Sequence, residues 1–279
     1  MVGVYAIRKL RNQIFVIGCW LAALFGLAWL TAILWELVSQ GAQYINGDFF
    51  TLSSPPPLQR GGMANAIVGS LIMVSMATVI GTPIGILAGT YLAEYGRSGR
   101  FAAVVGILNN ILLSAPSIVI GLFVYQIAVA PVHGFSALAG AVALAMIVLP
   151  VVVRTTENML LLIPDSQREA ASALGAPLSL VINGVLWKAA RTGIVTGVLL
   201  AVARISGETA PLLFTALNNQ FFSTDLSKPM ASLPGMIFQF ALSPYKSWHN
   251  LAWAAALLVT ATVLALSVLA RVLVAGEKR

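Results

Sequence analysis

The sequence predicts an all-α integral membrane protein with six transmembrane helices. Of its 279 residues, 59% are hydrophobic and only 9% are charged, and the mean hydropathy is +0.91. A soluble protein of this size could not bury so much apolar surface while exposing so few charged groups. Six runs are long enough to cross a bilayer, which needs about 20 apolar residues per helix. They are residues 14–38, 64–92, 101–130, 135–153, 192–217 and 251–274.

The distribution of Lys and Arg predicts that both termini face the cytoplasm. Only Arg60, Lys228 and Lys246 lie in one set of loops, whereas twelve of the sixteen basic residues lie in the other set. Basic loops stay on the cytoplasmic side of a membrane, which places the loop at residues 155–190 there as well. The charges cluster at the ends of apolar runs without interleaved aromatics, so they indicate a lipid bilayer and no nucleic acid partner. The twelve are Arg8, Lys9, Arg11, Arg97, Arg100, Arg154, Arg168, Lys188, Arg191, Arg271, Lys278 and Arg279.

No metal or nucleotide site is expected on this chain. The single cysteine, Cys19, lies in an apolar run, and His133 and His249 are far apart. These residues therefore do not make a metal site with suitable ligand spacing. No lysine completes a Gly-Lys-Ser/Thr phosphate loop, so if ATP drives the protein, another chain binds the nucleotide.

A polar island at residues 165–177 interrupts the apolar sequence. Ser166 and Glu169 are spaced as a capping box, which satisfies free N–H groups at the start of a helix. The alanines that follow favour a helix, and Gly175 followed by Pro177 ends it. We expect an isolated helix at residues 166–174 that is too short to be stable alone in water, so something else must hold it.

Glycines and prolines predict how the spans pack and bend. Gly81, Gly85 and Gly89 recur every four residues on one face of the second span, and small residues allow close approach of a neighbouring helix. The spacing does not decide whether that neighbour belongs to this chain or to another subunit. The apolar run around Met236 is too short to span, so residues 218–250 predict an external loop with a short interfacial or re-entrant helix. Prolines within the spans should bend them: Pro83, Pro116 and Pro150.

Two charges, Arg204 and Glu208, lie inside the fifth span. Arg204 is about 18 Å along this helix, past the middle of a hydrocarbon core about 30 Å thick. The spacing of four allows a structural ion pair on one helix face. Intramembrane ionisable residues are functional by default, however, and Arg suits bidentate capture of an oxyanion. We therefore favour a substrate path containing Arg204 and Glu208, with Ser206 and Thr209 as nearby hydroxyl donors.

Two stretches resemble a known family. Glu169-Ala170-Ala171, followed after three residues by Gly175, is similar to the EAA loop of ABC-transporter membrane subunits, although Trp187-Lys188 stands where that pattern has Leu-Pro. Residues 199–217 resemble the fifth-helix signature of PstA-type permease subunits of bacterial phosphate ABC importers. They read Leu-Leu-Ala-Val-Ala-Arg-Ile-Ser-Gly-Glu-Thr-Ala-Pro-Leu-Leu-Phe-Thr-Ala-Leu.

The resemblance implies the type I ABC importer permease fold and a place in the bacterial cytoplasmic (inner) membrane. Residues 1–62 would form an anchor helix and external loop, residues 63–274 the transmembrane domain, and residues 275–279 a short cytoplasmic tail. The chain would form half of a phosphate path together with a homologous second permease (PstC-like). Two ATPase subunits (PstB-like), with ATP and Mg²⁺, and an extracytoplasmic phosphate-binding protein (PstS-like) would complete the importer. An ATPase would dock on Ser166, Glu169, Ala170, Ala171, Leu174 and Gly175.

Two other interpretations remain open. A permease for another oxyanion, such as sulfate, molybdate or phosphonate, would share the fold and the loop. A non-conducting membrane sensor or scaffold would explain a docking loop but gives Arg204 no task. No repeated pore loop predicts a channel, and no metal or nucleophile constellation predicts an enzyme.

Overall fold

The computed structural model describes residues 2–96 and 99–276, and every regular element within them is helical. Three of the basic residues used in the topology prediction lie outside the described residues: Arg97, Lys278 and Arg279. The end of the predicted tail also lies outside them. The long helices are α1 (Val2–Gly41), α3 (Ala64–Thr90), α6 (Ala137–Leu161), α9 (Trp187–Ile205) and α12 (Lys246–Gly276). The shorter elements are η1 (Ala42–Tyr44), α2 (Gly47–Thr51), η2 (Tyr91–Tyr95), α4 (Arg100–Ser114), α5 (Ser117–Val124), η3 (Tyr125–Val129), α7 (Asp165–Ala173), α8 (Leu178–Val181), η4 (Ile182–Leu186), α10 (Ala210–Thr215) and α11 (Leu233–Ala241).

The six predicted spans are confirmed in number, provided that one bent helix pair is counted as a single span. Among the described residues, five helices are long and apolar enough to cross a membrane. The sixth crossing is a pair of helices, Arg100–Ser114 and Ser117–Val129, that meet at 108°. The five continuous spans are Val4–Tyr44, Ala64–Tyr95, Ala137–Leu161, Leu178–Ile205 and Lys246–Val274.

The third predicted span, residues 101–130, is therefore not one helix. The sequence predicts a bend at Pro116, whereas the structure has a complete break between α4 and α5. Proline lacks the N–H that a helix interior needs, and it pushes the preceding residue out of the helical region. Ala115 accordingly has an extended backbone, with ψ at 132°. Pro83 and Pro150, by contrast, remain inside α3 and α6.

The fifth predicted span, residues 192–217, is wrong at both ends. The helical segment starts at Leu178 and ends at Ile205, and α10 begins only at Ala210. Gly207 is unfavourable in a helix interior, while Pro211 suits the first turn of a new helix because its N–H is not needed there. The continuous helix face predicted to carry Arg204 and Glu208 therefore does not exist.

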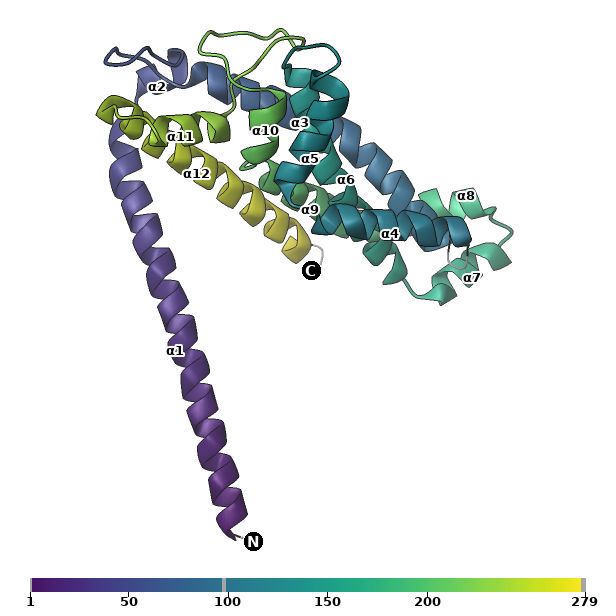
Figure 1. Cartoon of the computed structure of the whole chain (residues 1–279). Coiled ribbons are helices and arrows are strands. Elements are labelled where there is room, and N and C mark those ends of the chain that lie inside the picture. The colour runs from purple at the N-terminus through teal and green to yellow at the C-terminus, as the bar shows by residue number, and fades with distance from the viewer. Residues whose placement is uncertain (1, 97–98, 277–279) are drawn as a thin grey trace.

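The predicted short helix near Met236 is α11, which lies in the long segment between α10 and α12 and packs against α12. The hydroxyl of Ser232 accepts a hydrogen bond from the N–H of Gly235 at 3.2 Å and so caps the start of this helix. In Figure 1, α11 and α2 lie at the opposite end of the bundle from α7. The bundle thus has two distinct ends, one carrying the long loops and one carrying the polar island.

Helix α3 lies against α6 of the same chain through its glycine face. A Cβ atom on Gly89 would stand 2.6 Å from the carbonyl oxygen of Val153, so the two backbones meet with no room for a side chain. Such close approach is what small residues permit between membrane helices. The three glycines of this face are buried: Gly81, Gly85 and Gly89.

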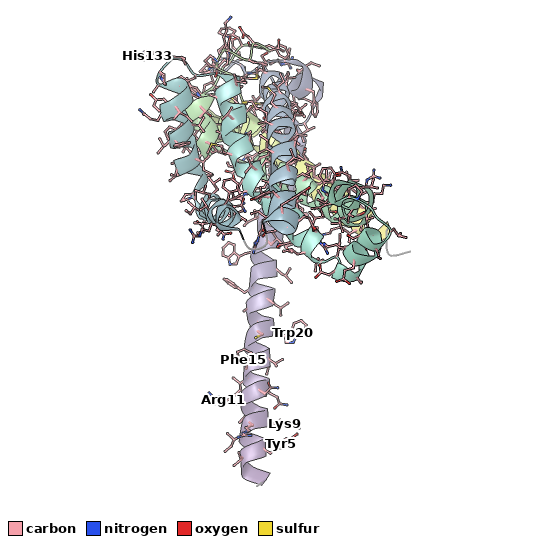
Figure 2. All side chains as sticks on the ribbon, turned by 90° about the vertical axis from the view of Figure 1, so that its right-hand side faces the viewer. Tyr5, Lys9, Arg11, Phe15, Trp20 and His133 are labelled. Atoms are coloured by element: carbon pink, nitrogen blue, oxygen red, sulfur yellow. The ribbon has the colours of Figure 1, made fainter. Side chains whose placement is uncertain are left out.

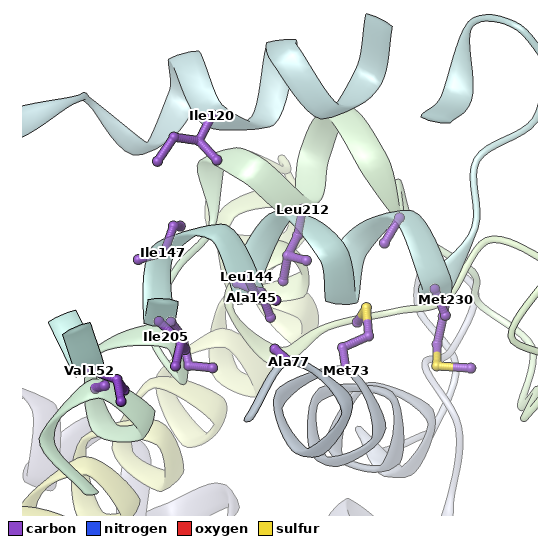
Figure 3. Close-up of a cluster of buried hydrophobic side chains, with 14 residues drawn as sticks. Met73, Ala77, Ile120, Leu144, Ala145, Ile147, Val152, Ile205, Leu212 and Met230 are labelled. Carbon is purple, nitrogen blue, oxygen red and sulfur yellow. The ribbon is translucent and has the colours of Figure 1, made fainter. Parts of the chain in front are cut away.

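Helix α6 is the central element of the bundle. Its Leu144 is fully buried in an apolar cluster with Met73 of α3, Ile205 of α9 and Leu212 of α10 (Figure 3). Helices α4, α5 and α9 also pack directly on α6. The position of α6 therefore determines where the ends of all these helices lie.

Helix α1 stands largely apart from this bundle (Figure 1). Near its end, Gly41 packs against α12, where a Cβ would stand 2.8 Å from the carbonyl oxygen of Trp253. Along the rest of the helix, Tyr5, Phe15 and Trp20 are exposed and point away from the axis with no neighbouring element (Figure 2). An apolar helix of this length, exposed all round, suits contact with lipid or with another membrane helix.

The tight contact of α3 with α6 predicts the effect of Gly89→Ala. The added methyl group would press on the carbonyl oxygen of Val153 and on Thr156, and overpacking of this kind costs about 1–3 kcal/mol. We expect a lower melting temperature for the purified protein in detergent. Gly106→Ala in α4, where a Cβ meets nothing within 4 Å, is the matched control. Equal melting temperatures for the two variants would contradict the account.

Candidate functional site

Arg204 lies in the last turn of α9, where the negative end of the helix dipole favours a cation. Its Nε atom is 3.7 Å from Oε1 of Glu208, which lies beyond the end of the helix. At this distance the two charges attract each other without a good hydrogen bond. The Arg204 side chain is 50% exposed and that of Glu208 is 17% exposed. A half-exposed guanidinium held this loosely is able to bind another anion.

Interruptions of regular helix come together beside Arg204. Its side chain lines a small pocket with Ala115 and Ser117, at the break between α4 and α5, and with Pro150 of α6. The break between α9 and α10 begins two residues after Arg204. Irregular backbone at membrane depth is tolerated where it is buried in protein or lines a cavity, and discontinuous helices build the binding sites of many transporters. The pocket itself, of about 10 Å³, is too small for an oxyanion, so within this chain these interruptions can form only one wall of a path.

The structure does not bring all four predicted path residues to one place. The hydroxyl of Ser206 donates to the carbonyl of Val202 at 2.8 Å. Ser206 also lines a different pocket, of about 250 Å³, between α3, α11 and α12. Thr209 precedes α10, and its carbonyl accepts a hydrogen bond from the N–H of Leu212 at 3.2 Å. Arg204 and Glu208 therefore lie together, whereas Ser206 lines a different pocket.

The polar island folds into α7, a helix of nine residues that begins one position earlier than predicted. The predicted capping box of Ser166 and Glu169 is wrong, because Pro164 occupies the N-cap position and no side chain caps the helix. Pro164 has an extended ψ of 141°, so the helix starts at once after it and Ser166 is already its second residue.

The C-terminal end of α7 is closed as the sequence predicts. Gly175 has a φ of +79°, in the left-handed region that glycine tolerates without steric cost. The N–H groups of Gly175 and Ala176 donate to the carbonyls of Ser172 and Ala171 at 2.9 and 3.2 Å. This pair of bonds is a Schellman motif, which satisfies carbonyls that the helix leaves free.

One face of α7 contacts the rest of the chain and the other is open. Ala171 is half-buried against the apolar cluster that contains Leu160 and Val181. Leu174, just past the helix, is 89% exposed, and three residues predicted to contact an ATPase are also exposed: Ser166, Glu169 and Ala170. The open side therefore offers both a carboxylate and a large apolar side chain to a partner.

Helix α7 is held in place by Arg168, which the sequence shows only as one of many basic loop residues. Its Nε and Nη2 atoms donate to the two carboxylate oxygens of Glu94 at 3.0 and 2.7 Å. The Arg168 side chain is 14% exposed and that of Glu94 only 3%. Hydrogen bonding to Glu94 raises the pKa of Arg168 above its ordinary value, so the guanidinium stays charged. The signal for this pair was Glu94 itself, an acid just past the end of an apolar run.

Trp187 makes a second connection to α3. Its indole Nε1–H donates to the hydroxyl oxygen of Thr90, the last residue of α3, at 3.0 Å. That hydroxyl in turn donates to the carbonyl of Ile86 at 2.7 Å. Trp187 stands where the EAA pattern has leucine, so the departure from the pattern supplies a contact between the start of α9 and the end of α3.

Within the part of the chain that the structure describes, no group of three or more His, Cys, Asp and Glu side chains is placed to hold a metal ion. His249 lies with its Nε2 atom 2.6 Å from the carbonyl oxygen of Ser243. This contact stabilises the turn before α12, which is a structural role.

Comparison with known proteins places this chain in a transporter family. Residues 81–279 match the family described as the binding-protein-dependent transport system inner membrane component. The chain is 53% identical to the phosphate transport system permease protein PstA of Haemophilus influenzae, over 97% of this chain and 96% of the relative. The corresponding protein of Yersinia pestis is 55% identical, over 97% and 92%. A probable PstA of Methanocaldococcus jannaschii is 37% identical, over 94% and 93%.

The chain therefore belongs to the binding-protein-dependent inner membrane transport components and, among them, to the PstA permease family. A solved structure, an inward-facing crystal form of the MetNI methionine ABC transporter, has a similar fold. The TM-score is 0.57 at 21% identity, and the match covers 75% of this chain and 93% of that one. The predicted type I ABC importer permease fold is thus confirmed. The protein is a multi-pass membrane subunit of a transporter, not an enzyme.

The left-handed conformation of Gly175 predicts the effect of Gly175→Val. A Cβ there meets nothing within 4 Å, so the cost is purely conformational, about 1–2 kcal/mol. We expect the exit from α7 to change direction and less ATPase to co-purify with the membrane subunit. Gly175→Asn is the matched control, because asparagine tolerates this conformation better than other residues. Full retention of the ATPase by the valine variant would contradict a role for this turn in docking.

Proposed function

We propose that this chain is the permease subunit of an ATP-driven importer of inorganic phosphate and forms half of the path across the bacterial inner membrane. The observation that carries the proposal is the identity of 53–55%, over nearly the whole chain, to phosphate transport permeases. The half-exposed Arg204 beside interrupted helices supplies a compatible anion site. Other oxyanions share the chemistry of that site, so the relatives, rather than the geometry, favour phosphate.

At the proposed site, Arg204 binds the passing anion. A guanidinium presents parallel N–H donors that match two oxygens of a phosphate group. Glu208, 3.7 Å from the guanidinium, competes with the anion for the same positive charge. This competition keeps the affinity moderate, which a transport site needs because the substrate must also leave. A homologous second permease (PstC-like) provides the other wall of the path.

The other partners are assigned by the side of the membrane on which each surface lies. The open face of α7, with Ser166, Glu169, Ala170 and Leu174, docks on one of two ATPase subunits (PstB-like), which bind ATP and Mg²⁺. Ala171 packs against this chain, and Gly175 sets the direction in which the chain leaves α7. An extracytoplasmic phosphate-binding protein (PstS-like) delivers the substrate at the opposite end, where α2 and α11 lie (Figure 1).

The proposed topology has both termini in the cytoplasm, because the positive-inside rule assigns the basic loops to that side. We place the boundary of the transmembrane domain at residue 63, just before α3 starts, and treat α1 with its loop as a separate anchor. The coupling loop at about residues 155–190 then includes the end of α6 and the start of α9.

The test of this function is uptake of radiolabelled phosphate into vesicles that contain this chain, its candidate ATPase, the sister permease and the binding protein. We expect uptake to require both ATP and this chain, and to be unaffected by excess sulfate. Uptake of sulfate instead would assign the protein to another oxyanion. A stably assembled complex that takes up neither anion would contradict a conducting role and favour a sensor or scaffold.

Substitution of Arg204 tests the anion site in the same assay. Arg204→Ala removes hydrogen bonds to a charged group, worth about 1.5–3 kcal/mol, so uptake should fall by about ten- to a hundredfold. Arg204→Lys keeps the positive charge but loses the planar guanidinium. Its phosphate uptake should lie between that of the wild type and that of Arg204→Ala. Arg191→Ala, an exposed arginine near the other end of α9, serves as the control. Wild-type rates of uptake in both Arg204 variants would contradict the proposal that Arg204 binds the anion.

Substitution of Glu208 tests the competition between carboxylate and substrate. Glu208→Gln removes the negative charge that opposes the anion at Arg204 while keeping the size of the side chain. We expect phosphate to be retained longer on the assembled complex, and rapid-quench measurement of a single transport cycle would show slower release. Release at the wild-type rate would assign Glu208 a structural role only.

A further inference from the structure

Arg168 joins three separate elements at the end of the bundle that carries α7. Glu94, its bidentate partner, belongs to η2, the π-helical continuation of α3. The guanidinium also donates to the carbonyl of Leu160 in the last turn of α6, at 2.8 Å, and to that of Ile163 in the turn after α6, at 2.6 Å. Its Nη1 atom is 3.3 Å from Oδ1 of Asp165, the first residue of α7. One side chain from α7 therefore holds the ends of both α3 and α6.

This junction is largely buried and lies next to an apolar cluster. Ala93, next to Glu94, is fully buried, and so is Leu160. They pack in one cluster with Ile182 and Leu186 of η4, against which Ala171 of α7 also lies. Separating a buried ion pair is strongly unfavourable, because each partner is left as an uncompensated charge at low dielectric constant. Helix α7 thus cannot move away from Glu94 without a large penalty.

The covalent connections of α7 to its neighbours are short turns. On one side α7 is joined to α6 through a turn that ends at Pro164, and on the other it leaves through Gly175 and Pro177. Both connections are hydrogen-bonded turns, and neither continues as a regular helix into α7. Besides these turns, Arg168 and the apolar contacts around it connect α7 to η2 and to the end of α6.

We propose that the Arg168–Glu94 pair transmits the displacement of α7 to α3 and α6, which makes Arg168 a positioning residue for transport. The inference rests on the proposed function, in which an ATPase docks on α7. Arg168 touches no substrate. It keeps α7, η2 and the end of α6 together as one body while the ATPase moves, so that ATP hydrolysis is converted into movement of the path.

The test is the number of phosphate ions transported per ATP hydrolysed by the complete transporter in proteoliposomes. The variant is the double substitution Arg168→Met with Glu94→Gln, which removes both charges and so leaves neither buried alone. We expect the complex to assemble and to hydrolyse ATP, while the ratio of phosphate to ATP falls about tenfold, a typical size for coupling between sites. A merely structural role would lower assembly and both rates together and would leave the ratio unchanged.

The matched control is Arg154→Met with Glu157→Gln, an ion pair in the same region of α6 whose side chains are 52% and 20% exposed. In this control variant, the number of phosphate ions transported per ATP hydrolysed should equal that of the wild type. A wild-type ratio in the Arg168/Glu94 double variant would overturn the inference. Absence of phosphate uptake by the wild-type complex would instead overturn the proposed function, so the two failures are distinguishable.

If the double variant does not assemble, Arg168→Lys tests whether the bidentate contact with Glu94 is needed for coupling. Lysine keeps the positive charge opposite Glu94 but cannot make the bidentate contact or reach both carbonyls of α6 with a planar fork. We expect an assembled complex with a ratio between those of the wild type and an uncoupled transporter. A wild-type ratio in this variant would show that the bidentate junction is not needed for coupling.

Discussion

The close contact of α3 with α6 is the constraint on which the rest of the structure depends. At Gly89 the two backbones approach so closely that a single methyl group would collide with a carbonyl oxygen. This approach brings the end of α3, with Glu94, next to the end of α6, with the carbonyls of Leu160 and Ile163. Only because these groups converge can one arginine from α7 bind all of them. The packing of the membrane core thus determines how α7 is held.

Regular and irregular backbone are divided between the two sites. The α7 junction joins two long helices, α3 through its continuation η2 and α6 at its C-terminal end. The surroundings of Arg204 are instead built from two chain breaks, at residues 115–116 and 206–209, and from the helical proline Pro150. In the proposed importer, the long helices carry the movement that ATP hydrolysis drives. The breaks give the wall of the path the freedom to respond to it.

Local patterns were sufficient to predict much of this fold. Apolar run length predicted the six crossings, and Gly175 followed by Pro177 predicted where α7 ends. The break in the third span was missed because apolar residues continue on both sides of Pro116. The break in the fifth span is marked by Ser206, Gly207, Glu208 and Thr209, but these residues were assigned to one continuous helix. The Arg168–Glu94 junction was missed for a different reason, since 74 residues separate its partners. Nothing local pairs them until α3 is packed on α6.

The most direct test of the central claim is the distance between α7 and the end of α3 during the ATPase cycle. Cys19, the single native cysteine, is first replaced by serine. Spin labels are then attached at Ser172→Cys and Tyr95→Cys, which are both exposed positions. The distance between the two labels is measured by pulsed electron paramagnetic resonance. The account predicts one narrow distance distribution, identical in the nucleotide-free and ATP-bound complexes, that broadens when Arg168→Met and Glu94→Gln are added. A distance that changes by several ångströms between the two nucleotide states, or a distribution equally narrow without the ion pair, would contradict it.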